Sequence, residues 1–436
     1  MKIHGGEMAA GSSARTLQRR AVAALGALAV AGLALSACAP DPAIEIPAPS
    51  QVEGQLPEPT LTELQTAVAD AMAATGSSGA IVGVWVPWSG TWVTGVGTVS
   101  PTSETPVSTD MTFRIGDVTR AMTCDALYAA VDDELVALDD PVSDYVSGIP
   151  DIDVTLLELC NGTAGIGSYQ ARLQPLWLSN PTRAWNPREL AAYGLGQERT
   201  ERGVAWRDSD ASYVLLGLAL ERVTGKPASE LLAEVVFEPL GLEHTTLPEG
   251  KGKWAGRSAL SGNLTVKDAE GVMNCTEPLD MTPVSTTTGF TDSGVVSTID
   301  DLGRYMQALA VGALAEEGSA AQDRWSDPKP VSSASWFTYT GGAFQAGSLI
   351  GQYGSVPGYL TGAFADPGTG LTVAVVLNNS AASSATPAYL AWELAAIASK
   401  APAAAGQTAP EFGLPWTAEQ YHEVIAKAAI CPVPES

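Results

Sequence analysis

Acidic and basic side chains recur in this chain at spacings that could serve a reactive cleft. In the segment FRIGDVTRAMT, Asp117 and Arg120 lie three residues apart, so on a helix both side chains would face the same side. Further along, Asp208 and Asp210 place carboxyl groups on either side of the Ser209 hydroxyl. Carboxylates can take part in acid–base or nucleophilic chemistry. Arginine stays protonated because its pKa lies above ~12, so it cannot be the base that activates a serine.

The segment that contains Asp117 and Arg120 resembles the active-site signature F-x-I-G-S-x-T-K of the class C β-lactamase and D-alanyl-D-alanine carboxypeptidase family, which has the penicillin-binding fold. In that family the serine attacks a carbonyl carbon and the lysine helps to take its proton. Asp117 and Arg120 occupy these two positions here. The segment from Asp208 to Asp210 stands where the family has Tyr-Ser-Asn. The segment from Gln352 to Gly354 stands where the family has His-x-Gly or Lys-x-Gly.

Other blocks resemble the same family in the same order, over roughly residues 60 to 400. They are Gly79 to Ser100, Leu135 to Val146, Thr155 to Gly167, Trp206 to Pro227, Ser293 to Leu309 and Gly351 to Asn379. The resemblance implies an α/β (α+β) fold, in which an antiparallel sheet is flanked by helices and a helical region is inserted. We therefore expect a β-lactamase-like domain at 61–400, with the sheet in 61–115 and 332–400 and the helical region in 116–331.

The resemblance also implies that serine acyl transfer has been lost, because all three motifs have changed. We expect no active catalytic group at the family's catalytic positions Asp117, Arg120, Asp208, Asp210 and Gln352. Asp117 is expected to pair with Arg120 and to cap the start of its helix. Because carboxylates outnumber the single guanidinium group, a ligand of this pocket is expected to be neutral or cationic rather than a carboxylate.

Two pocket positions keep the family's residue type. Ser209 stands in a matched motif, but no basic residue lies beside it. Gly354 retains the family's glycine, and the strand after it could still present backbone N–H groups.

Other candidate nucleophiles have little support in the sequence. The one S-x-x-K sequence, Ser326 to Lys329, lies among prolines in a polar loop and is interpreted as coincidental. His244 and His422 fall in a loop and in the C-terminal tail, away from any matched serine.

A divergent hydrolase is the alternative function. It would use Asp117 and Asp208, or Ser209, on a neutral or cationic substrate, and a pair of these carboxylates could act as in glycosidases. Asp117, Asp208 and Asp210 could also supply oxygen ligands to Ca²⁺ or Mg²⁺. Arg120 beside them disfavours a cation, so we expect no metal and no cofactor.

The N-terminal residues have the pattern of a secretory signal. Arginines precede an apolar run from Ala21 to Leu35, which is shorter than the ~20 residues that span a bilayer, and small residues lead to Cys38. Since the sequence before Cys38 resembles a bacterial lipobox, we expect residues 1–37 to be a lipoprotein signal peptide and Cys38 to be lipidated. Residues 38–60 contain six prolines and are expected to form an extended tether. A plain signal peptide is the alternative.

Four further cysteines form an even set, which suits an oxidising compartment. Cys124, Cys160, Cys275 and Cys431 allow three disulfide connectivities. In the family that the chain resembles, the helix that carries Cys124 packs beside the helix that ends at Cys160. The resemblance therefore implies the pairs Cys124–Cys160 and Cys275–Cys431.

At 436 residues the chain can form one large domain or two interleaved ones. Its formal net charge of −25 argues against nucleic acid as a partner, because phosphate binding needs a basic face. Leu61 to Gly76 has the apolar period of an amphipathic helix. Residues 401–436 predict a linker followed by a short helix, with Thr417 as its cap and Gln420 completing a capping box.

These patterns together predict a membrane-anchored, extracytoplasmic, β-lactamase-related lipoprotein that is a serine hydrolase-like pseudoenzyme. Its expected role is binding or regulation in the cell envelope. We expect the lipid at Cys38 to bind the membrane, and a cell-wall component or a protein to be the partner. The chain is expected to be a monomer.

Overall fold

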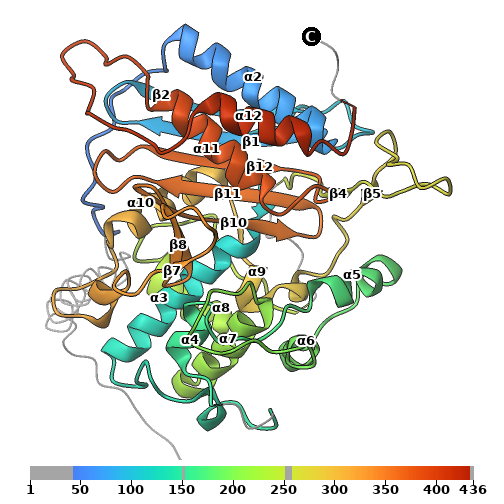
Figure 1. Ribbon diagram of the computed structural model, residues 1–436, viewed down its shortest axis with the longest axis vertical. Coiled ribbons are helices and arrows are strands. Elements are labelled where there is room, and N and C mark those ends of the chain that lie inside the picture. The colour runs from blue at the N-terminus through green and yellow to red at the C-terminus, as the bar shows by residue number, and fades with distance from the viewer. Residues whose placement is uncertain (1–42, 150–152, 251–257, 433–436) are drawn as a thin grey trace, which may run out of the picture. The chain divides into compact units, whose positions relative to one another are not determined.

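The computed structural model describes residues 43–149, 153–250 and 258–432. Its centre is an eight-stranded sheet in the order β2-β1-β12-β11-β10-β9-β8-β7, with antiparallel neighbours (Figure 1). The strands are β1 (Gly79–Val86), β2 (Gly90–Gly97), β7 (Lys329–Pro330), β8 (Phe337–Thr340), β9 (Ala343–Ala346), β10 (Leu349–Val356), β11 (Tyr359–Ala365) and β12 (Thr372–Leu377). The predicted fold class, an antiparallel sheet flanked by helices, is confirmed.

The sheet joins the two ends of the domain. The hairpin β1–β2 pairs with β12 through β1, with Val82 opposite Val375. Successive side chains of a strand point to opposite faces. Accordingly Ile81 belongs to the core beneath one face, and Val82 and Val84 belong to the core beneath the other. Since β1 is buried on both faces, its sequence is almost continuously apolar.

Three helices cover one face of the sheet: α2 (Glu58–Thr75), α11 (Thr386–Ala398) and α12 (Ala418–Lys427). They come from opposite ends of the sequence, and Figure 1 shows blue α2 beside red α11 and α12. The predicted end of α2 is confirmed, because Gly76 closes it in the left-handed conformation that glycine tolerates. Thr417 caps α12 by accepting a hydrogen bond from the Gln420 backbone N–H, at 3.3 Å.

The other face of the sheet contacts α10 (Ile299–Val311), beyond which lies the helical region. Its helices are α3 (Thr119–Asp132), α4 (Leu156–Cys160), α5 (Gln170–Ser179), α6 (Pro187–Leu195), α7 (Asp210–Thr224), α8 (Ala228–Leu232) and α9 (Phe290–Ser293). Shorter turns are η1 (Gly116–Val118), η2 (Val142–Asp144), η3 (Ala233–Phe237), η4 (Thr286–Thr288) and η5 (Ala320–Asp323). The apolar helix α7 is buried at the centre and contacts α3, α4, α6, α8 and α9.

The region 116–331, which we expected to hold the helices, also contains short strands. It contains β4 (Asn263–Leu264) paired with β5 (Leu279–Asp280), and β6 (Val296–Ser297), which pairs with β3 (Phe113–Arg114). It also contains β7. These strands are only two residues long, which is too short for the alternating pattern that reveals a strand in sequence.

The expected tether contacts the domain in the part that the structure describes. Ile44 donates its backbone N–H to the Pro239 carbonyl at 2.7 Å, and Leu56 donates to the Thr91 carbonyl at 3.2 Å. Residues 43–57 are extended but hydrogen-bonded to the domain, and α2 already begins at Glu58. The predicted signal peptide and Cys38 lie outside the described residues. Within those residues, no helix has both the length and the apolar character that crossing a membrane would require.

Two disulfides tie distant segments together, and both are the pairs that the resemblance implied. Cys124–Cys160 joins α3 to α4, with the Cα atoms 5.7 Å apart. Cys275–Cys431 joins a loop of the helical region to the segment after α12, across 156 residues of sequence. The second link holds the C-terminal segment against the end of α2, where Ile430 donates its backbone N–H to the Ala74 carbonyl at 2.9 Å.

Removing the long-range disulfide should destabilise the domain. Replacing both partners, as in Cys275→Ser with Cys431→Ser, is expected to lower the free energy of unfolding by about 2–5 kcal/mol, because the unfolded chain regains the freedom of a long loop. Urea unfolding of the variant and the parent protein measures the difference. Peptide mapping without reductant is the control for the pairing. An unchanged urea midpoint would contradict this role.

Candidate functional site

The Arg120 side chain is buried in the first turn of α3 and is surrounded by carboxylates. Its Nε donates to Asp292 Oδ1 at 2.8 Å, and its Nη1 donates to Asp208 Oδ1 at 2.7 Å. A third carboxylate oxygen, Asp117 Oδ2, lies 3.5 Å from Nη2. The guanidinium group also lies over the Tyr213 ring, 5.0 Å from its centre. We call Arg120 and the four carboxylates of Asp117, Asp208, Asp210 and Asp292 the acidic cluster.

Asp117 is positioned by close packing of η1 against β10. A Cβ atom added at Gly354 would lie only 2.1 Å from Asp117 Oδ2, so glycine is required at this position of the strand. The expected pairing with Arg120 is present, but the expected helix cap is not: no side chain caps the start of α3. Asp117 lies in η1, one residue before the N-cap Val118, and its carboxyl group faces Arg120 and Gly354 instead.

Burial changes the pKa of the Asp117 carboxyl group. Loss of solvent raises the pKa of Asp117 well above its usual value of 3.8, although the Arg120 charge opposes the shift. The pKa of Asp292 is raised by burial as well, against the same opposing charge. One guanidinium group cannot offset all of the surrounding carboxylates in a desolvated site, so a neutral carboxylic acid is favoured at Asp117.

Asp208, Ser209 and Asp210 enter the site at the start of α7. Ser209 is the N-cap of this helix and accepts the Ser212 backbone N–H at 3.2 Å, so its buried hydroxyl serves a structural role. Asp208 is more exposed and reaches Arg120 from the rim. The Asp210 carboxylate instead accepts hydrogen bonds from the residues at the start of α5: Ser168 Oγ at 2.6 Å, Tyr169 N at 2.7 Å and Gln170 N at 3.0 Å.

Asp210 combines this hydrogen bonding with almost complete burial. Burial, followed by the nearby Asp292 carboxylate, raises the pKa of Asp210 to about 7. The hydrogen bonds from Ser168 and Tyr169 act in the opposite direction, because they favour the ionised form. Asp210 therefore titrates near neutral pH.

Gln352 does not replace the imidazole or ammonium group that the family has at this position. It is completely buried in β10, where Nε2 donates to the Gly342 carbonyl at 2.8 Å and to Tyr339 Oη at 3.3 Å. Tyr339 in turn shares a 2.6 Å hydrogen bond with Tyr213, the ring beneath Arg120. Gln352 thus begins a neutral hydrogen-bonded chain that holds β8 and β10 against α7.

The structure brings all of the predicted positions together and adds one that sequence reasoning missed. Asp292 lies in α9, which can approach α7 because Gly217 has no side chain: a Cβ atom there would lie 2.1 Å from Thr291 Oγ1. No spacing in the sequence links Asp292 to Asp117. One sequence feature could have pointed to Asp292: it lies immediately before the segment from Ser293 that resembles the family.

The alternative nucleophiles lie elsewhere. Lys329 of the S-x-x-K sequence pairs with Asp327 at 3.0 Å, at the start of β7. His422 is 2.9 Å from the Glu393 carboxylate, between α12 and α11 on the far face of the sheet. The backbone N–H of His244 donates to Asp301 Oδ2 at 2.7 Å. Within the described ranges, no group of three or more His, Cys, Asp or Glu side chains is arranged to hold a metal ion.

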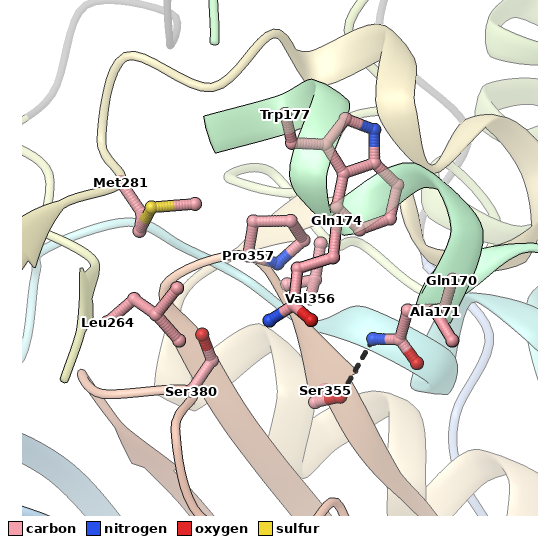
Figure 2. Close-up of a pocket in the computed structure, with 10 residues that line it drawn as sticks. All are labelled: Gln170, Ala171, Gln174, Trp177, Leu264, Met281, Ser355, Val356, Pro357 and Ser380. Atoms are coloured by element: carbon pink, nitrogen blue, oxygen red, sulfur yellow. Dashed lines mark hydrogen bonds between the residues drawn. The ribbon is translucent and has the colours of Figure 1, made fainter. Parts of the chain in front are cut away.

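Little free space remains at the acidic cluster, but a larger pocket adjoins it. The cavity lined by Asp117, Arg120, Asp210 and Asp292 has a volume of only about 10 Å³, which is room for at most one water molecule. The neighbouring pocket has about 210 Å³ and lies between α5 and the end of β10. Both spaces are lined by Gln170 and Ser355, and Figure 2 shows the hydrogen bond that joins them, in which Gln170 Nε2 donates to Ser355 Oγ at 3.1 Å.

Removing the Arg120 guanidinium group should destabilise the folded protein. Arg120→Met leaves buried carboxylates without their cation, so we expect a loss of about 3–5 kcal/mol in the free energy of unfolding at pH 8. The loss should shrink at pH 5, because protonated carboxyl groups no longer need a counter-charge. Asp208→Asn is the matched control, since it removes the most exposed carboxylate and should cost less than about 1 kcal/mol. Denaturant unfolding at both pH values measures these differences, and equal losses for the two variants would contradict the assignment.

The pKa of Asp210 makes a second prediction. An unfolded chain ionises this carboxyl group near pH 3.8, but the folded chain does so near pH 7. Raising the pH through this interval therefore favours the unfolded state, and stability should fall between about pH 4 and 7 and then level off. Asp210→Asn should flatten part of this slope in melting curves. Glu393→Gln is a needed control, because burial also raises the pKa of Glu393 to about 7.

The β-lactamase family model matches residues 64–396 of the chain. D-alanyl-D-alanine-carboxypeptidase/endopeptidase AmpH of Escherichia coli strain K12 is 28% identical over 162 residues, which cover 34% of this chain and 40% of that protein. D-aminopeptidase of Brucella anthropi is 26% identical over 147 residues, which cover 33% of this chain and 28% of that protein. The chain thus aligns with less than half of the length of these relatives.

Solved structures share the fold. A D-stereospecific amidohydrolase from Streptomyces sp. superposes with a TM-score of 0.64 at 22% identity, covering 73% of this chain and 94% of its own. The octameric penicillin-binding protein homologue from Pyrococcus abyssi gives a TM-score of 0.62 at 21% identity, and the match covers 76% of this chain and 75% of that one. The family match extends over well more than half of the sequence and agrees with this fold, so the chain belongs to the β-lactamase family.

Proposed function

We propose that this β-lactamase-related protein does not catalyse serine acyl transfer and acts by binding, as a lipid-anchored protein on the extracytoplasmic face of the cell membrane. The observation that carries the proposal is the acidic cluster. The position of the family's nucleophile holds Asp117, and the position of its lysine holds an arginine whose donors face three carboxylates. A binding or regulatory role in the cell envelope needs the fold and an open pocket, and both are present.

The chemistry of the cluster supports loss of turnover. An acyl transfer needs a nucleophile, a base and donors for the developing oxyanion. Asp117 could form only a mixed anhydride, which reverts easily, and burial favours its protonated and less nucleophilic form. Arg120 cannot accept a proton, and Ser209 is a buried helix cap. The cavity beside Asp117 is also small, with a volume of about 10 Å³.

The location is proposed from the N-terminal sequence and the disulfides. The run that ends in Leu35-Ser36-Ala37-Cys38 fits lipidation of Cys38 after removal of residues 1–37. Two disulfides in the described residues are consistent with folding outside a reducing cytoplasm. Globomycin treatment of a producing strain, followed by membrane fractionation, tests this part separately.

The names of the relatives suggest the class of ligand. They include a D-alanyl-D-alanine-carboxypeptidase/endopeptidase and a D-aminopeptidase, both of which act on peptides. We therefore propose that the partner is a cell-wall component or protein that presents a peptide-like group. The alternative, a divergent hydrolase that uses Asp117 and Asp208, is favoured by one observation: the raised pKa of Asp117 suits a general acid.

The purified full chain should form no covalent adduct with a β-lactam. We expect intact-mass spectrometry to show the unmodified mass after incubation with fluorescent penicillin, and nitrocefin to be hydrolysed no faster than in buffer. A class C β-lactamase that is labelled under the same conditions is the positive control. A stable adduct on any serine would refute the proposal.

Restoring the family residues tests the reason for the loss. Asp117→Ser with Arg120→Lys should give little or no acylation, because Asp208, Asp210 and Gln352 remain changed and Asp292 would still pair with the lysine. Screening the parent chain against ester, amide and glycoside substrates tests the alternative function. Turnover that disappears in both Asp117→Asn and Asp208→Asn would establish a carboxylate mechanism instead.

A further inference from the structure

The pocket beside the acidic cluster is built from five separate segments. One wall is α5, which contributes Gln170, Gln174 and Trp177, and the opposite wall is the end of β10 with Ser355 (Figure 2). The loop segments around β4, β5 and β12 close the remaining side with Leu264, Met281 and Ser380. Its volume of about 210 Å³ is below the roughly 300 Å³ at which pockets for drug-sized ligands begin. It therefore suits one small group at the end of a larger molecule.

Among the residues that the structure describes, no charged side chain lines this pocket, although the whole chain carries a formal net charge of −25. Half of the wall is apolar, with Trp177, Leu264 and Met281 around the space shown in Figure 2. A buried ion would lose its hydration here without meeting a counter-charge, which costs far more than burying a neutral amide. The nearest cation in the acidic cluster, Arg120, already faces three carboxylates.

The polar groups of the wall match those of an amide. Gln174 is exposed at the rim, and its own amide can both donate and accept hydrogen bonds. Ser380 Oγ accepts the Gly358 backbone N–H at 2.9 Å, which leaves its hydroxyl hydrogen to donate. Ser355 Oγ accepts from Gln170 in the same way and can also donate. Donors and an acceptor thus surround a space whose other wall is apolar.

Gln170 closes the inner end of the pocket. Its side chain donates to Ser355, while its backbone N–H donates to the Asp210 carboxylate at 3.0 Å. The same residue therefore belongs to the wall of the pocket and to the acidic cluster. A ligand that rests against Gln170 is kept from the carboxylates by one neutral side chain.

We infer that this pocket binds a neutral amide group that carries a small apolar side chain, as at a blocked end of a peptide. The inference rests on the binding role proposed above and specifies its ligand. The apolar side chain packs against Trp177, Leu264 and Met281, and the amide bonds with Gln174, Ser355 and Ser380. A free carboxylate or ammonium group on the same residue weakens binding, because it adds a charge that nothing in the wall offsets.

Three leucine derivatives that differ only in charge test this selectivity. N-acetyl-leucinamide is neutral, N-acetyl-leucine is anionic and leucinamide is cationic at pH 7. Ligand-observed NMR titration of the purified full chain, at millimolar ligand because such small molecules bind weakly, gives the three dissociation constants. We expect the neutral compound to bind at least tenfold more tightly than the anionic one and more tightly than the cationic one. N-acetylglucosamine is included as a neutral amide that lacks the apolar side chain, and it should bind more weakly.

A charge change at the rim makes the test specific for this pocket. Gln174→Ala should weaken N-acetyl-leucinamide about fivefold, through loss of one hydrogen bond. Gln174→Glu should shift the preference to leucinamide, because a carboxylate then offsets the ammonium group. Gln407→Glu is the matched control, since it makes the same change at an exposed position in the C-terminal linker and should alter nothing. Melting temperatures confirm that the variants are folded.

Tightest binding of the anionic or the cationic compound to the parent chain overturns the inference. So does binding of none of the compounds, tightest binding of the sugar, or a Gln174→Glu variant with unchanged preference. These outcomes leave the proposed non-catalytic role standing. A covalent β-lactam adduct would instead refute the proposed function, whichever of the compounds binds to the pocket.

Discussion

Burial of the Arg120 guanidinium group among carboxylates is the interaction on which the rest of the site depends. An unpaired charge in a desolvated position would cost several kcal/mol, so each donor of the group needs an acceptor at a fixed place. Those acceptors come from η1, from the segment before α7 and from α9, which are far apart in sequence. Two glycines permit the approach, Gly354 against Asp117 and Gly217 against Thr291. One buried cation therefore fixes the relative positions of four elements.

The same interaction determines how much space is left at this site. Asp117, Asp210 and Asp292 line the cavity together with Arg120, and the volume of that cavity is about 10 Å³. The neighbouring pocket has about 210 Å³, because its walls are α5 and the end of β10 rather than the ion pairs around Arg120. The two spaces therefore differ in character: ion pairs surround one, and neutral side chains line the other.

The sequence predicted those parts of the molecule that local pattern or family order determines. The antiparallel sheet, the end of α2 at Gly76 and both disulfide pairs are as expected. Asp292 escaped prediction because its role arises from the packing of α9 on α7, which leaves no periodic signal. The capping role of Asp117 was wrong because a buried ion pair competes with the cap. Proline content suggested an extended tether, and it gave no sign of the hydrogen bonds that join this segment to the domain.

The two disulfides differ in how early each can form while the chain is made from its N-terminus onward. The partners Cys124 and Cys160 are 36 residues apart, whereas Cys275 must wait for a thiol that emerges 156 residues later. If the short pair oxidises first, it withdraws two competing thiols before Cys275 appears. Cys275 would then meet Cys431 without competition from the other pair, and correct pairing would need no isomerase. Refolding of the complete reduced chain offers no such order, so scrambled isomers are expected there more than when the chain emerges progressively from its N-terminal end.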